Sequence, residues 1–272
     1  MRRIHPLPVT AGITALAVLL VLGVGAGCGK QKRDYSSDLV AAAQAFTGAG
    51  SVHALVNAAV SPLEGETGMT VNVQGDAWVD LRAPALEARF TVLGMEVSLR
   101  YVGGQAYLKV GGSWYSLSAE SLGVSEDIPS SLADLLAALP EVLSASVSVE
   151  YLGEKKVGTF DCVELDVHPD IKAISELEEV RKLAEDLDIA PEELEEILSG
   201  SNPVIRVCLQ KGAPVVRQVY MAADVELSPF NKQLGLGLLP EKGRLEITAD
   251  FPEYDVEVTV EPPAEARPFR GL

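Results

Sequence analysis

Apolar and polar residues alternate along most of this chain, and this period of two limits the fold more than any other feature of the sequence. Residues 69–81 show the pattern well, because Val71, Val73 and Ala77 occupy every second position between mostly polar neighbours. Successive side chains of a β-strand point to opposite faces, so this segment is predicted to be a strand with one apolar face. A chain with 47% hydrophobic residues has enough apolar surface to bury such a face.

Eleven further segments are predicted to be strands on the same grounds. They are residues 51–61, 86–92, 95–101, 106–110, 113–117, 146–152, 157–167, 203–210, 214–227, 244–251 and 253–260. Glycine pairs at 103–104 and 111–112 predict hairpin turns, and Gly153-Glu154-Lys155-Lys156 is expected to form another. Because consecutive strands usually pair with each other, we expect a large, strongly twisted antiparallel sheet of about 11–12 strands.

Three segments change to a helical period. Asp38 is the expected N-cap of a helix that ends near Gly48, residues 131–145 are expected to form two short helices, and Asp170 is expected to cap a helix within 170–200. These helices are the elements that can cover the apolar face of the sheet. The predicted class is therefore α+β, a large twisted sheet with helices on its apolar face. Without a clear break in composition, residues 38–272 are interpreted as one domain.

The N-terminus is typical of an export signal. Arg2 and Arg3 precede an apolar run over residues 13–24, which is short for a membrane span. Residues 1–27 are therefore predicted to be a cleaved signal peptide, and a short uncleaved anchor is the alternative.

The end of this signal resembles the lipobox of bacterial lipoproteins, in the residues Val24-Gly25-Ala26-Gly27-Cys28. The resemblance implies cleavage after Gly27 and acylation of Cys28, which would hold the protein on the outer face of the cell membrane. Two or three acyl chains give stable anchoring. Residues 28–37 are polar after the cysteine and are expected to be a tether.

Three longer segments carry a second resemblance. They are 101–109 (YVGGQAYLK) with the following Gly112-Ser113-Trp114-Tyr115, 151–162 (YLGEKKVGTFDC), and 251–254 (FPEY) with 258–263 (VTVEPP). In this order, and with the lipobox, they resemble the LppX/LprG-type bacterial lipoproteins, which share the LolA-like half-barrel. The resemblance implies a hydrophobic cavity that holds acyl chains, and a role in moving lipids or lipoglycans across the cell envelope, in which an envelope transporter is a possible partner.

The alternation of apolar residues places a candidate cavity wall on the concave face. Its expected members on the sheet are Val71, Val73, Phe90, Met95, Val97, Leu99, Leu108 and Met221, and its expected members on the helices are Leu132, Leu135, Leu136 and Leu143. Ordinary core packing is the alternative for each of them. Residues 228–243 form a glycine-rich apolar loop that is predicted to gate the cavity mouth through Phe230, Leu234, Leu236 and Leu238, or to pack on the nearest helix.

The cysteines Cys162 and Cys208 are predicted to lie on the convex face, on two strands that flank the 170–200 helix. Since export leads to an oxidising compartment, we expect a disulfide between them, and a reactive dithiol is the alternative.

Little in the sequence indicates catalysis. His53 and His168 lack metal-ligand spacing and are interpreted as structural, with no charged partner expected for His53, and the acidic residues of 176–196 are interpreted as a solvated helix face. Weak calcium binding by that face is the alternative. A net charge of −17 argues against nucleic-acid binding.

The sequence therefore predicts a monomeric, membrane-anchored lipoprotein that binds a lipid or glycolipid as carrier or chaperone. It predicts no enzyme activity, cofactor or metal site. The alternative function is a cell-envelope scaffold or sensor module with a filled core.

Overall fold

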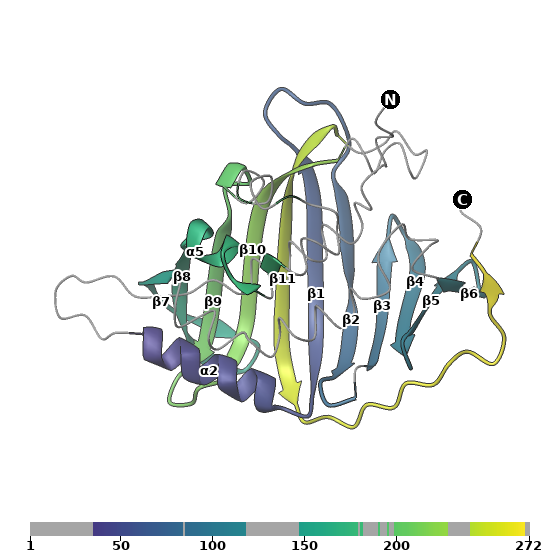
Figure 1. The fold of residues 1–272 in the computed structure, drawn as a ribbon, viewed down its shortest axis with the longest axis horizontal. Helices are drawn as coiled ribbons and strands as arrows, with labels where there is room; N and C mark the ends of the chain where they lie inside the picture. Colours follow the sequence, from purple (N-terminus) through teal and green to yellow (C-terminus); the bar gives the residue numbers. More distant parts are fainter. Residues whose placement is uncertain are drawn as a thin grey trace.

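A single sheet of twelve strands dominates the computed structural model, which describes residues 35–83, 85–117, 147–178, 180–181, 190, 195, 199–227 and 240–269. The strand order is β12-β6-β5-β4-β3-β2-β1-β11-β10-β9-β8-β7 (Figure 1). The prediction of a large sheet with about twelve strands is confirmed. The sheet is mixed rather than purely antiparallel, because β12 pairs with β6 in parallel.

Two antiparallel meanders make up this sheet. The first contains β1 (Ser51–Pro62), β2 (Val71–Asp80), β3 (Ala85–Val92), β4 (Met95–Val102), β5 (Gln105–Val110) and β6 (Ser113–Leu117). The second contains β7 (Val147–Val157), β8 (Phe160–Pro169), β9 (Val204–Gln210), β10 (Val216–Glu226) and β11 (Lys242–Tyr254). Antiparallel pairing of β1 with β11 joins the meanders into one sheet, and we call this pairing the seam.

Two predicted strand boundaries are wrong. Strand β7 continues through Gly153-Glu154-Lys155-Lys156, and the chain turns instead at Gly158-Thr159. Gly153 lies at a register shift between β7 and β8, so the segment that the sequence predicts to be a turn is a bulge within a strand. The expected last hairpin is also replaced by one long strand, β11, which runs past Pro252 because β1 supplies its partner.

The chain after β11 is extended but forms no strand until β12 (Arg267–Pro268) on the far edge of the sheet. Figure 1 shows this segment in yellow, running below the ends of β1 to β6. Its start is fixed by Asp255, whose Oδ1 accepts a hydrogen bond from the Gly50 amide at 2.8 Å. Further along, Arg100 donates to the Glu261 carbonyl at 3.1 Å. The segment therefore ties the seam to the β6 edge.

The helices are partly described. Helix α2 (Ser36–Gly48) begins after Tyr35, so Asp38 lies in its first turn rather than at its N-cap. Asp170 does cap α5 (Ile171–Ser175), because its Oδ1 accepts a hydrogen bond from the Ala173 amide at 3.0 Å. The helices expected within 131–145 lie outside the described residues.

Candidate functional site

Strand pairing gathers the apolar side chains on one face of the sheet. Ala54 lies opposite Ala77, Ala77 opposite Ala88, Ala88 opposite Leu99, and Leu99 opposite Leu108. Because directly paired residues point to the same side, the alternation read in each separate strand becomes one continuous surface from β1 to β6. We call this surface the apolar face, and the opposite one the polar face.

The apolar face is completely covered in one half of the sheet. On β8, β9 and β10 the inward side chains are buried apart from the half-buried Val163, and Leu165 has none of its surface exposed. Helix α2 packs against β10 and buries Leu39, Ala42 and Ala43, and Figure 1 shows it in front of the lower ends of these strands. At its end, the Phe46 ring meets the Phe251 ring edge-on at 5.4 Å. This part, the packed half, is a conventional hydrophobic core.

The other half is covered less. Val73, Phe90, Val97, Leu99 and Leu108 are all half-buried although they lie in the middle of paired strands. Interior positions of a sheet that packs on a filled core are normally fully buried. This part of the apolar face, formed by β11 and β1 to β6, is the open half and is the candidate functional site.

Small residues form the floor of the open half. Ala54, Ala77 and Ala88 are buried together, and Val56, Leu86, Phe90, Leu99 and Phe251 pack around them. Gly75 continues this floor under the Phe90 ring, and a Cβ there would lie 2.0 Å from the Arg89 carbonyl oxygen. Only glycine fits at this position, so the small floor is built into the backbone spacing as well as the side chains.

The predicted wall residues divide between these regions. Seven lie on the open half, namely Val71, Val73, Phe90, Met95, Val97, Leu99 and Leu108. Met221 lies in the packed half, paired with Ile205 and 7% exposed, where it contributes to the core. The helical candidates Leu132, Leu135, Leu136 and Leu143 and the mouth-loop residues Phe230, Leu234, Leu236 and Leu238 lie outside the described residues. The predicted wall did not include Val56, Leu86 and Phe251. Val56 and Leu86 share strands with Ala54 and Ala88, whereas Phe251 reaches the alanine floor only through the pairing of β11 with β1.

The two cysteines lie on the polar face as predicted, but the structure contains them as free thiols, so the disulfide prediction is wrong for this structure. Cys162 pairs with Gln210, and Cys208 pairs with Glu164, so the cysteines are diagonal neighbours on β8 and β9. Diagonal positions lie about 7–8 Å apart, beyond the Cα spacing of ordinary disulfides. Burial raises the pKa of Cys208 to about 11 despite the nearby Lys155 ammonium, so the thiol is protonated and unreactive at neutral pH.

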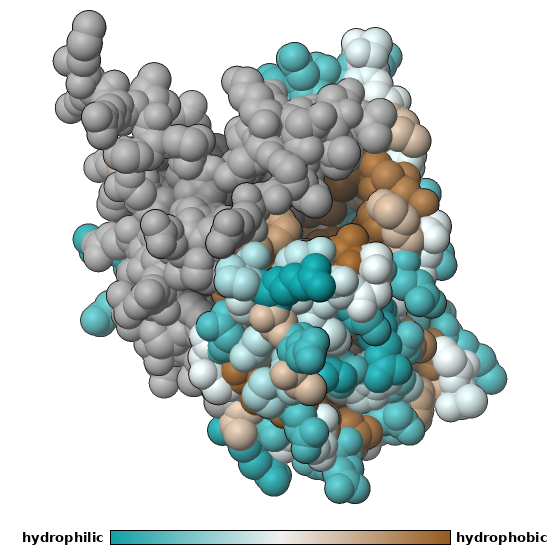
Figure 2. All heavy atoms as spheres, turned by 90° about the vertical axis from the view of Figure 1, so that its right-hand side faces the viewer, coloured by the Kyte–Doolittle hydropathy of each residue, from teal (hydrophilic) through white to brown (hydrophobic). Residues whose placement is uncertain are grey.

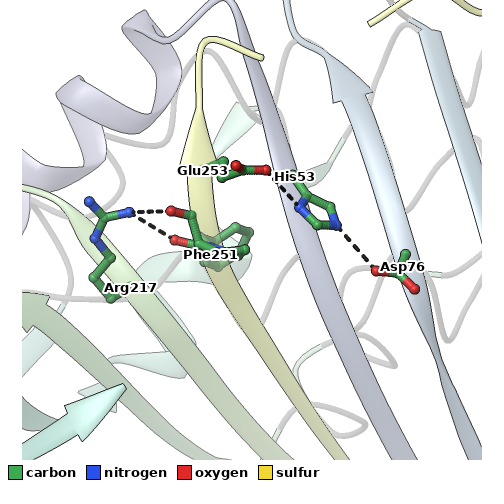
Figure 3. Close-up of polar contacts among 6 residues, drawn as sticks. His53, Asp76, Arg217, Phe251 and Glu253 are labelled. Atoms are coloured by element: carbon green, nitrogen blue, oxygen red, sulfur yellow. Dashed lines mark hydrogen bonds and ion pairs between the residues drawn. The ribbon is translucent and has the colours of Figure 1, made fainter. Parts of the chain in front are cut away.

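His53 has two charged neighbours, contrary to the prediction. Its Nδ1 lies 3.3 Å from Glu253 Oε2 on β11, and its Nε2 lies 3.2 Å from Asp76 Oδ1 on β2 (Figure 3). The imidazole also stacks on the Trp78 ring at 4.9 Å. These contacts lie on the polar face and connect β2, β1 and β11, so His53 has a structural role at the seam.

Arg217 lies at the lower end of β10, and its side chain contacts the face of the sheet that carries Cys162. Its guanidinium donates to the carbonyls of Phe251 and Pro252, each at 3.0 Å (Figure 3). It also lies 3.6 Å from the centre of the Phe160 ring. Burial raises the pKa of the nearby Tyr254 hydroxyl well above its ordinary value. These contacts link the lower ends of β8, β10 and β11.

The described residues contain no group of three or more His, Cys, Asp or Glu side chains arranged to hold a metal ion. None of the helices described is both long and apolar enough to cross a membrane.

Comparisons with known proteins place the fold. Neither a family model nor a curated protein matches the sequence. Among solved structures, LprF from Mycobacterium bovis aligns with a TM-score of 0.52 and 17% identity, over 87% of this chain and 100% of LprF. The chain has the LprF fold.

Two further structures align more loosely. Lipoprotein LppX from Mycobacterium tuberculosis has a TM-score of 0.48 and 15% identity, over 83% of this chain and 97% of LppX. A LolA-superfamily protein from Nitrosomonas europaea has a TM-score of 0.27 and 6% identity, over 84% of this chain and 96% of that protein. The resemblance seen in the sequence is confirmed at the level of the fold by the alignment with LprF.

Proposed function

We propose that this protein is an exported, lipid-anchored carrier or chaperone that binds the acyl chains of a lipid or glycolipid on the open half of the apolar face. The observation that carries the proposal is the contrast between the two halves of one sheet. Leu165 and its neighbours in the packed half are fully buried, whereas Leu99, Leu108 and Phe90 in the open half are half-buried at equally central positions.

The energetics favour an apolar ligand there. Each methylene group that leaves water for an apolar surface contributes about 0.8 kcal/mol, so an acyl chain covering the open half would bind through many small and additive contributions. The alanine floor supports this assignment because small side chains leave room above the sheet for a chain to lie. The polar part of the ligand would stay near the mouth of the site, where water can solvate it.

The anchor belongs to the same proposal. Acylation of Cys28 would hold the carrier at the outer face of the cell membrane, where lipid is loaded or released, with an envelope transporter as the partner that exchanges lipid. Burial raises the pKa values of Cys162 and Cys208, so neither thiol is activated as a nucleophile at neutral pH.

Native mass spectrometry of the exported chain from residue 29 onward tests the proposal. Because this form lacks Cys28, a bound lipid must occupy the fold, and we expect a reproducible adduct that is lost on denaturation. Phe90→Trp and Leu99→Trp should remove the adduct while the protein stays folded. Ser98→Trp is the matched control, because it changes the next residue on the opposite face of β4 and should leave the adduct in place.

A clean apo mass, unchanged after incubation with envelope lipid extract, would instead support a scaffold or sensor with a filled core. An adduct that survives both wall substitutions would show that the ligand binds elsewhere.

A further inference from the structure

Three of the six large apolar side chains that are exposed among the described residues lie at one end of the sheet, and they include the most exposed two. Met69, Leu93 and Met95 are 43%, 47% and 56% exposed, and all three lie at the upper end, where β1 leads to β2 and β3 leads to β4. Figure 2, which views the β6 edge, shows apolar side chains gathered in the upper part of the described surface and mainly hydrophilic ones below. We call these three residues the upper rim.

The backbone at Leu93 indicates that this exposure is not incidental. Leu93 and Gly94 form a two-residue hairpin loop in which both residues have positive φ, 51° and 79°. Such type I′ loops favour asparagine, aspartate or glycine at the first position, and leucine is disfavoured there because of its Cβ. Strain of this kind at an exposed apolar tip points to a function for the side chain rather than to stability.

The rim is continuous with the candidate site. Met95 pairs with Val92, and Val92 pairs with Val73, so the apolar face extends without interruption from its centre to the exposed tip. At the opposite end, the Phe46 ring of α2 packs edge-on against the Phe251 ring. A chain that enters or leaves the open half along the sheet would therefore pass the rim.

We propose that the upper rim inserts into the surface of an uncharged lipid bilayer. This inference rests on the proposed function, because Cys28 supplies the anchor. The seven residues 28–34 reach about 23 Å when extended, so the domain stays close to the bilayer at all times.

The chemistry of the rim fits this occupant. The rim side chains are aliphatic, whereas the anchors of protein–protein interfaces are enriched in Trp, Tyr and Arg. Glu64 and Glu66 lie on the loop between β1 and β2, and Glu96 follows Met95 on β4. These carboxylates would be repelled by an anionic surface, so a zwitterionic bilayer is the better match.

Depth-dependent quenching on the acylated full-length protein tests the inference. Leu93→Cys can be labelled selectively with a polarity-sensitive dye, because Cys162 and Cys208 are buried and Cys28 is acylated. Thr159→Cys is the matched control, since Thr159 is an exposed residue in the hairpin loop at the opposite end of the sheet. In phosphatidylcholine vesicles with brominated acyl chains, we expect strong quenching at position 93 and little at position 159.

A second variant separates insertion from folding. Leu93→Asn introduces the residue that the loop prefers, so the denaturation midpoint should not fall. When the dye is attached at Met95→Cys, adding Leu93→Asn should reduce quenching to the level of the Thr159→Cys control.

Three results would overturn the inference. They are equal quenching at positions 93 and 159, stronger quenching in phosphatidylglycerol than in phosphatidylcholine vesicles, and a blue-shifted dye that brominated lipid does not quench, which would indicate a protein partner. The carrier function is tested separately by native mass spectrometry, because the lipid adduct of the unanchored chain is measured without any bilayer.

Discussion

The contrast between the packed and open halves can be measured with two matched substitutions, Leu165→Ala and Leu99→Ala. Both leucines lie on the apolar face in the middle of antiparallel strands, but Leu165 is fully buried and Leu99 is half-buried. Replacing Leu165 removes three buried carbons, about 2.4 kcal/mol of transfer free energy, and leaves a cavity. We expect a loss of about 3 kcal/mol, compared with about 1 kcal/mol for Leu99→Ala in the lipid-free protein.

Urea denaturation followed by far-ultraviolet circular dichroism gives both free energies of unfolding. When lipid is bound, the loss in free energy of unfolding for Leu99→Ala should increase. The ligand completes the burial of Leu99, so truncating this side chain then also weakens lipid binding. Equal losses for the two variants in the lipid-free protein would refute the argument, since Leu99 would then be packed as tightly as Leu165. A lipid-independent cost at Leu99 would separately contradict its place in the wall.

Three further predictions concern other parts of the fold. Cys162 and Cys208 should react with a thiol reagent such as DTNB only as the protein unfolds, and fast labelling of the native protein would contradict their burial. Partial burial raises the pKa of Asp224, but hydrogen bonds from Asn202 and Arg244 and the charge of Arg244 outweigh this effect and hold the pKa below its ordinary 3.8. Asp224 therefore stabilises the fold above about pH 4, and this contribution is lost as the pH falls through the lowered pKa. Asp224→Asn should therefore lower stability at pH 7 and leave it nearly unchanged at pH 2 in urea titrations. Gly75→Ala should destabilise by at least about 2 kcal/mol because its Cβ meets backbone, whereas Gly48→Ala, which meets nothing within 4 Å at the end of α2, should be neutral or stabilising by thermal denaturation.

The sequence predicts the strands of this protein better than their partners. Alternation identified β2 to β6 almost residue by residue, because two-residue turns and glycine pairs mark their ends. The length of β11 could not be read in the same way, since Pro252 and Asp255 are local signals for a turn. Pairing with β1 overrides them, and that contact is distant in sequence.

The candidate site shows the same limit. Residues such as Leu99 and Phe90 were assigned to the correct face from their own strands, but the difference in burial between them and Met221 depends on where α2 packs. The two cysteines were likewise placed on the correct face. Whether they face each other directly or diagonally is set by the register of β8 and β9, which no local pattern encodes.

The seam between β1 and β11 has a consequence for how the chain reaches this fold. Gly50 and Asp255, which meet beside the seam, are 205 residues apart, so their contact closes one of the longest loops that the chain can form. Under the proposed export, the N-terminus would leave the cell first, so β1 to β6 would be outside before β11 is available. Until β11 arrives, β1 is an open edge beside an uncovered apolar face, which is a template for mispairing. The last strands to emerge therefore complete the sheet, and a chain cut before Lys242 would consist of two meanders without the strand that unites them.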